Sequence, residues 1–197
     1  MRRTPAALAA SATVLLLLLA GCDSDSSDSS SSSNQQTQDT GNDNNAGTAP
    51  GSDQVELPVL CDLVTAEDVG GILGLTVELE AGPFDDCEFS APDDLRDYSG
   101  ALGALSVDTG NGGFDALKSG SKAAMDAPVE HEIPVGDAGY VTTGTVFGGE
   151  NLQASAGALV GGVAYTVTLI QGSGHTEAEM VEVSQRLLEL VLSRTGG

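Results

Sequence analysis

Tryptophan is absent from the chain, aromatic residues are scarce and basic residues are few. Only 7 Lys and Arg residues stand against 29 Asp and Glu residues in 197, which gives a formal net charge of −22. Phosphate recognition needs a basic face and base stacking needs aromatic side chains, so the composition argues against a nucleic-acid-binding protein. The length allows about one folded domain of ordinary size.

The first residues have the layout of an export signal. Arg2 and Arg3 form a short basic region, and a run of small and apolar residues extends from Ala6 to Ala20. This run is short for a permanent membrane span but suits a signal peptide, which we predict for residues 1–21. The paired arginines leave general secretion and twin-arginine export both open.

The run ends in Leu19-Ala20-Gly21-Cys22, a pattern typical of bacterial lipoproteins. Small residues before the cut suit the peptidase, and the thiol receives the lipid, so we expect lipidation of Cys22. Two or three acyl chains would anchor the protein stably at the extracytoplasmic face of the cell membrane. The alternative is an ordinary secretory peptide followed by a chance cysteine.

Residues 23–54 contain no Val, Ile, Leu, Met, Phe, Tyr or Trp. Such a segment cannot bury enough apolar surface to offset the entropy cost of ordering. We therefore predict that residues 22–54 comprise the lipidated cysteine and a disordered Ser/Asp/Asn tether, and that residues 55–197 form a single domain.

Two further cysteines, Cys61 and Cys87, fall within this domain. An exported protein meets an oxidising compartment, and one pair allows one connectivity, so we predict a disulfide. A metal-binding or redox pair is the alternative, but neither cysteine belongs to a CxxC motif and no histidine lies nearby in the sequence.

Helix signals occur in three places. Thr65 and Asp68 form a capping-box variant before a helix over 66–73, and Thr176 and Glu179 form a capping box before a C-terminal helix. The apolar spacing predicts a C-terminal inner face of Met180, Val183, Leu187, Leu190 and Val191. A weaker helix is predicted for about 114–125, with Phe114, Leu117, Ala124 and Met125 inward.

Strand signals fill the remaining segments, with hydrophobic alternation or short β-rich runs. The predicted strands are 76–80, 87–90, 105–107, 129–133, 140–146, 152–160 and 163–170. A Gly161-Gly162 turn joins the last two strands, which is a hairpin signal. The expected fold class is therefore α+β: a mostly antiparallel sheet with about three packed helices and one disulfide.

No catalytic constellation stands out, and we assign no catalytic residue. Ser119 and Lys122 match the S-x-x-K of penicillin-recognising enzymes, but the companion motifs are missing. The two histidines are His131, between two glutamates on a predicted strand, and His175, which is expected to be exposed. A small cell-envelope serine hydrolase using Ser119 or a distant serine with either histidine remains the alternative function.

Carboxylates cluster around the second cysteine. The cluster comprises Asp85, Asp86, Glu88, Asp93, Asp94 and Asp97. Calcium favours several oxygen ligands, but the spacing meets no known calcium-loop rule, so a solvated acidic loop is preferred. We assign no metal ligand and no cofactor.

The chain resembles a family of actinobacterial envelope lipoproteins, the domain-of-unknown-function family 3558. The resemblance rests on the lipobox and tether, on Cys61-Asp62-Leu63-Val64-Thr65-Ala66-Glu67-Asp68-Val69, on Cys87-Glu88-Phe89, and on Gly136-Asp137-Ala138. It implies a disulfide-linked α+β domain of an exported lipoprotein, and it implies no catalytic residues.

These observations favour a lipid-anchored extracytoplasmic binding or accessory domain without catalytic activity. We expect the membrane as a partner through the acyl chains, together with an envelope protein or a small solute. A partner with a basic patch would be favoured electrostatically.

Overall fold

A computed structural model of the chain describes residues 55–93, 97–170 and 174–196. All of them belong to one compact unit, Ala49–Gly197. The predicted signal peptide, Cys22 and the tether over 22–54 lie outside the described residues, so those predictions stay open.

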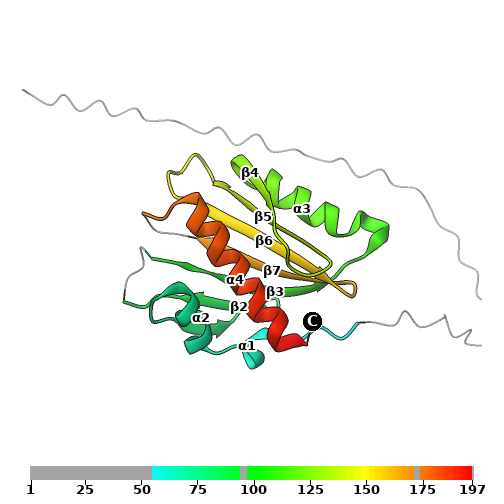
Figure 1. Cartoon of the computed structure of the whole chain (residues 1–197), viewed down its shortest axis with the longest axis horizontal. Helices are drawn as coiled ribbons and strands as arrows, with labels where there is room; N and C mark the ends of the chain where they lie inside the picture. Colours follow the sequence, from blue (N-terminus) through cyan, green and yellow to red (C-terminus); the bar gives the residue numbers. More distant parts are fainter. Residues whose placement is uncertain (1–54, 94–96, 171–173, 197) are drawn as a thin grey trace, which may run out of the picture. The chain divides into compact units, whose positions relative to one another are not determined.

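The strands form one seven-stranded antiparallel sheet in the order β1-β2-β3-β7-β6-β5-β4. This arrangement confirms the expected α+β class (Figure 1). The strands are β1 (Glu78–Ala81), β2 (Cys87–Ser90), β3 (Ser99–Ser106), β4 (Asp126–Glu132), β5 (Ala138–Thr145), β6 (Gln153–Val160) and β7 (Val163–Ile170). The helices are α1 (Leu60–Leu63), α2 (Ala66–Leu73), α3 (Gly113–Ala123) and α4 (Glu177–Thr195), with a 3-10 turn η1 (Thr109–Asn111).

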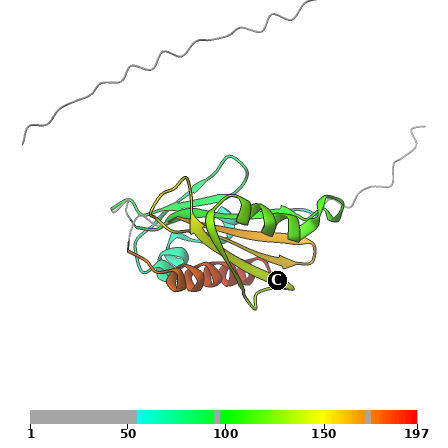
Figure 2. The same ribbon diagram turned by 90° about the horizontal axis from the view of Figure 1, so that it is seen from above.

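The two faces of the sheet are covered differently. Helices α2 and α4 lie on one side of the sheet and α3 lies on the other (Figure 2). Side chains alternate between the faces along each strand. The register pairs Leu102 with Val167 and Val167 with Ala156. All three are fully buried, so they mark the face under α4, here named the inner face.

Helix α4 packs on the inner face because strand β6 offers it a row of small residues. The inward residues of β6 are Ala154, Ala156 and Ala158, all fully buried, and they let a helix approach the strand closely. The buried residues of α4 are Met180, Ser184, Leu187, Leu188, Val191 and Leu192. The predicted inner face is therefore slightly wrong: Val183 and Leu190 lie at its margin and are only partly buried.

The N-terminal helices are fastened to this layer by covalent and local interactions. A disulfide joins Cys61 of α1 to Cys87 of β2, which confirms the predicted pair. Thr65 and Asp68 form the predicted capping box of α2. Arg194, near the end of α4, places its guanidinium 2.7 Å from Asp68 Oδ1 and so connects α4 to the start of α2.

Helix α3 covers half of the opposite, outer face, over β4, β5 and β6. Tyr140 stands across from Gly157, and a Cβ on that glycine would lie 2.7 Å from the tyrosine ring. The Ser121 hydroxyl of α3 lies 3.0 Å from the Tyr140 hydroxyl and 2.8 Å from that of Ser155. The glycine thus makes room for the ring that helps hold α3.

Two expectations about these elements were wrong. Strand β3 begins at Ser99 rather than Leu105, because its first half consists of Ser, Gly and Ala with little hydrophobic alternation to detect. Helix α3 buries no side chain fully, and Ala124 is an exposed residue just beyond its end.

The capping boxes predict an acid-sensitive contribution to stability. Hydrogen bonds from the Thr176 backbone N–H and hydroxyl hold the pKa of Glu179 below its usual 4.5. A carboxylate with a lowered pKa stabilises the fold above its unfolded-state pKa, and that stabilisation is lost as pH falls through the folded-state value.

Glu179→Gln removes this charge but keeps an oxygen that can accept the capping hydrogen bonds. The difference in melting temperature between the parent chain and this variant should be largest near about pH 7 and shrink by about pH 3. A difference that stays constant over this range would contradict the assignment. Comparing the two chains at each pH cancels the general relief of charge repulsion on acidification.

Candidate functional site

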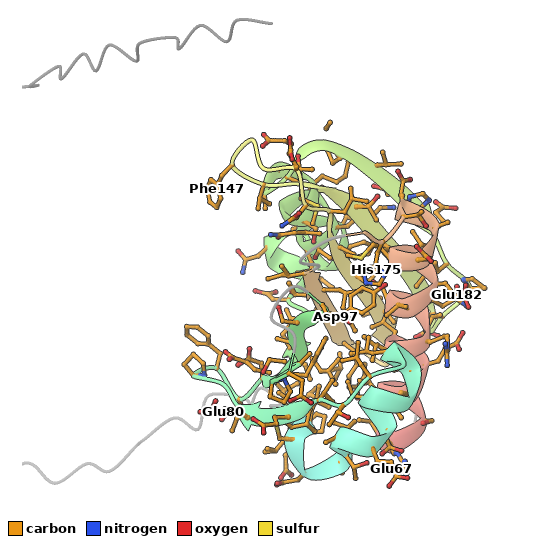
Figure 3. The ribbon with its side chains drawn as sticks, turned by 90° about the vertical axis from the view of Figure 1, so that its left-hand side faces the viewer. Glu67, Glu80, Asp97, Phe147, His175 and Glu182 are labelled. Carbon is orange, nitrogen blue, oxygen red and sulfur yellow. A yellow bond between two sulfur atoms is a disulfide. The ribbon has the colours of Figure 1, made fainter. Side chains whose placement is uncertain are left out.

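Half of the outer face has no helix over it. Contacts of α3 reach β4, β5 and β6, whereas β1, β2, β3 and β7 have no covering helix on this face in the described part of the chain. Figure 3 shows Glu80 and Phe147 on the side away from α4, whose Glu182 points the opposite way. The region over β1, β2, β3 and β7 is named here the open face.

The open face contains a hollow of about 570 Å³, which we name the groove. Its outward side chains belong to two chemical kinds: carboxylates and hydroxyls along one part, and small or aliphatic groups along another. They are Glu78, Glu80, Glu88, Ser90, Ser99, Ala101, Thr168 and Ile170. Leu79, Phe89 and Gly100 line the groove as well and complete its floor.

Strand pairing brings the three glutamates of the groove together. Glu80 lies directly opposite Glu88 in the β1–β2 ladder, and Glu78 precedes Glu80 by two residues on the same face. Like charges placed directly opposite each other destabilise a sheet. The pairing of Glu80 with Glu88 therefore does not stabilise the fold. Binding of a ligand explains better why two acidic residues lie opposite each other here.

Within the described residues, no ion pair neutralises these glutamates. The basic side chains of that part of the chain lie on α3 and α4, away from the groove: Lys118, Lys122, Arg186 and Arg194. Both lysines are paired with Glu130, Arg194 with Asp68, and Arg186 donates to the Ile72 carbonyl. Among the residues that the structure describes, the groove thus has three carboxylates and no basic partner for them.

Two phenylalanines in loops between strands are exposed, and only the first of them adjoins the open face. Phe84 lies in the turn between β1 and β2 and is 88% exposed, and Phe147 lies in the β5–β6 loop and is fully exposed. Figure 3 shows Phe147 projecting outward on the same side of the sheet as Glu80. The chain has only four phenylalanines, so two in solvent are a notable departure from burial.

The backbone conformation of Phe147 is unusual as well. Its φ of 54° lies in the left-handed region, which is costly for a bulky side chain. The neighbouring Gly148 adopts φ 67°, and its N–H donates to Asp126 Oδ2 at 2.8 Å, which holds the loop. A strained, exposed aromatic residue on a held loop is typical of a residue kept for a contact rather than for folding.

A second hollow, of about 600 Å³, lies between β4 and α4 and includes His131, Glu177 and Arg186. His131 Nε2 is 2.9 Å from Glu177 Oε1, although the angle does not make a hydrogen bond. The opposite charges of Arg186 and Glu177 both line this hollow, so it lacks the one-signed charge of the groove.

Ser119 and His131, two of the residues named for the hydrolase alternative, are not brought together. Ser119 is an exposed residue of α3 on the outer face, whereas His131 projects from the inner face opposite buried Val141. Lys122 is paired with Glu130 rather than placed beside Ser119 to activate it. These positions give no support to a Ser119–His131 pair.

The other histidine is more enclosed than expected. The ring of His175 stacks on Tyr98 with centroids 4.0 Å apart, and its Nε2 lies 3.4 Å from Asp97 Oδ1. Burial, with the nearby Glu179 and Asp97 charges, raises the pKa of Tyr98 to about 12. The contacts dock the start of α4 against the beginning of β3, which is a structural role.

The acidic cluster around Cys87 is spread over different features. Asp86 accepts a hydrogen bond from the Phe84 N–H, Glu88 lies in the groove and Asp97 pairs with His175. Asp94 lies outside the described residues. Among the residues that the structure describes, no group of three or more His, Cys, Asp or Glu side chains is placed to hold a metal ion.

Comparisons of the chain with protein-family models, curated proteins and solved structures found no match. In the described part of the chain, no helix has both the length and the apolar character needed to span a membrane. The groove must therefore be interpreted from its own chemistry.

Sequence reasoning missed most of this site. The alternation Glu78-Leu79-Glu80 placed both acids on one face of a strand, but only the strand order brings Glu88 opposite Glu80 and leaves that face uncovered. The two phenylalanines were detectable in principle, because each lies in a polar or glycine-rich turn between predicted strands.

Proposed function

We propose that this protein is a lipid-anchored extracytoplasmic binding or accessory domain without catalytic activity, of the kind found in envelope lipoproteins of the domain-of-unknown-function family 3558. Acyl chains on Cys22 hold it at the cell membrane, and the tether lets the folded domain reach its partner. The groove on the open face is the observation that carries the proposal.

Several features of the groove support binding over catalysis. It combines aliphatic surface with carboxylates that have no basic partner among the described residues, and the exposed Phe84 lies in the adjoining β1–β2 turn. Binding sites typically combine apolar area with a few polar groups that fix orientation. Its described lining offers serines and glutamates but no histidine, lysine or cysteine to serve as the usual partner of a nucleophile.

The test is chemical crosslinking in living cells, followed by affinity recovery of the full chain and mass spectrometry. Cys22→Ala, which cannot be lipidated, serves as the control. We expect one envelope protein to be enriched with the parent chain and lost with Cys22→Ala. Failure to recover a partner that depends on the anchor would contradict the proposal of a protein partner. It would favour a small solute as the ligand instead.

A further inference from the structure

We infer that the groove binds an extended, cationic segment of a partner protein, with Glu78, Glu80 and Glu88 receiving its basic side chains and Phe84, in the adjoining β1–β2 turn, packing on an apolar one. This inference rests on the proposed binding function and specifies the chemistry of the partner.

Charge complementarity identifies the basic character of the segment. Three carboxylates gather on one face of two paired strands without a cation from the described part of the chain. Arginine and lysine side chains would relieve the repulsion between Glu80 and Glu88, so part of the binding energy comes from removing an unfavourable interaction. Arginine suits the site best, because its planar guanidinium can pair with carboxylates through two hydrogen bonds.

The spacing of the acids indicates an extended conformation. Residues two apart on a strand are separated by roughly 7 Å, the same distance that separates alternate side chains of any extended peptide. Glu78 and Glu80 therefore match basic residues at alternate positions of a segment that runs along β1. Glu88 lies across the ladder from Glu80, so one basic side chain can contact both carboxylates.

Phe84 supplies an apolar anchor point. Aromatic side chains contribute disproportionately to binding when a partner removes them from water. Phe84 comes from the turn that joins the two glutamate-bearing strands, and its neighbour Asp85 has a left-handed φ of 60°.

The probe is a short synthetic peptide of alternating arginine and leucine, titrated into the full chain by calorimetry. A peptide of alternating glutamate and leucine is the matched control ligand. We expect the arginine peptide to bind with an affinity that falls as salt is raised, and the glutamate peptide not to bind.

Two double variants locate the binding. Glu80→Gln with Glu88→Gln removes two charges from the groove, whereas Glu67→Gln with Glu182→Gln removes two exposed charges from α2 and α4. We expect the substitutions in the groove to weaken binding of the arginine peptide about tenfold. The control substitutions should weaken it less than about twofold. Phe84→Ser should also weaken binding, by about fivefold.

Loss of binding by the groove variant cannot be explained by unfolding. The variant removes a like-charge pair, so its melting temperature should be no lower than that of the parent chain. Absence of peptide binding, or equal weakening by the two double variants, would overturn the inference. If the cell crosslinking still yields an anchor-dependent partner, the proposed function survives without this site. If peptide binding maps to the groove but no partner is captured, the proposed function fails instead.

Discussion

Replacing Cys61 and Cys87 together with alanine is expected to lower the free energy of unfolding by about 3 to 4 kcal/mol. The bridge closes a loop with a sequence separation of 26 residues, and the chain-entropy model gives this value for a loop of that size. The disulfide restricts the unfolded chain, so the parent chain gains less conformational entropy on unfolding than the variant without the bridge does.

Local structure explains why nothing else replaces the bridge. Helix α1 has only four residues and no side-chain cap, and Leu60 is its one fully buried residue. Without the disulfide, little holds this turn against the sheet. Thermal unfolding should show a melting temperature lower by about 10 °C, and the parent chain under reducing conditions should match the variant. An unchanged melting temperature in the oxidised double variant would contradict this account.

Truncating Leu188 to alanine is expected to destabilise the domain by about 2 to 5 kcal/mol. Leu188 is fully buried on α4, the helix that packs on β6 with its row of buried alanines. Because alanines lie beneath the helix, no long side chain can move into the space that the leucine leaves. The cost therefore includes a cavity as well as the lost burial.

Leu190→Ala is the matched control for this prediction. It is the same substitution on the same helix, at a residue that is only partly buried. Urea denaturation should give a markedly smaller loss for Leu190→Ala than for Leu188→Ala. Equal losses would mean that α4 does not pack on the sheet with the face described here.

The local elements of this fold were largely predictable from the sequence. Both capping boxes, the Gly74 and Gly196 C-caps and the exact limits of β2 and β7 follow from residue patterns. The buried Ser184 explains why the inner face of α4 was placed slightly wrongly, because a polar residue in the centre of a helix face gives no hydrophobic signal.

The candidate site was much less predictable, for a physical reason. Its groove depends on the pairing of β3 with β7, strands separated by more than fifty residues in the sequence, and on α3 covering only the other half of the outer face. Hydrophobic alternation shows which residues share a face of a strand, but it does not give strand order. The first half of β3, the floor of the groove, had little alternation at all.

The turn at Gly136-Asp137 illustrates the same limit. A turn with a left-handed glycine was expected there, and Gly136 has φ 68°. Asp137, however, accepts a hydrogen bond from the N–H of Gly161 in the β6–β7 turn at 3.2 Å. The residue fastens two turns that are distant in sequence, which only the assembled sheet reveals.

The most direct measurement of the central claim places a photo-crosslinking amino acid at position 84 of the full chain in living cells, with position 182 on the opposite face as the control. We expect an adduct with an envelope protein from position 84 and none from position 182, with the crosslinked peptide rich in arginine or lysine. Adducts of equal yield from both positions, or an acidic crosslinked peptide, would contradict the assignment of the open face as the binding surface.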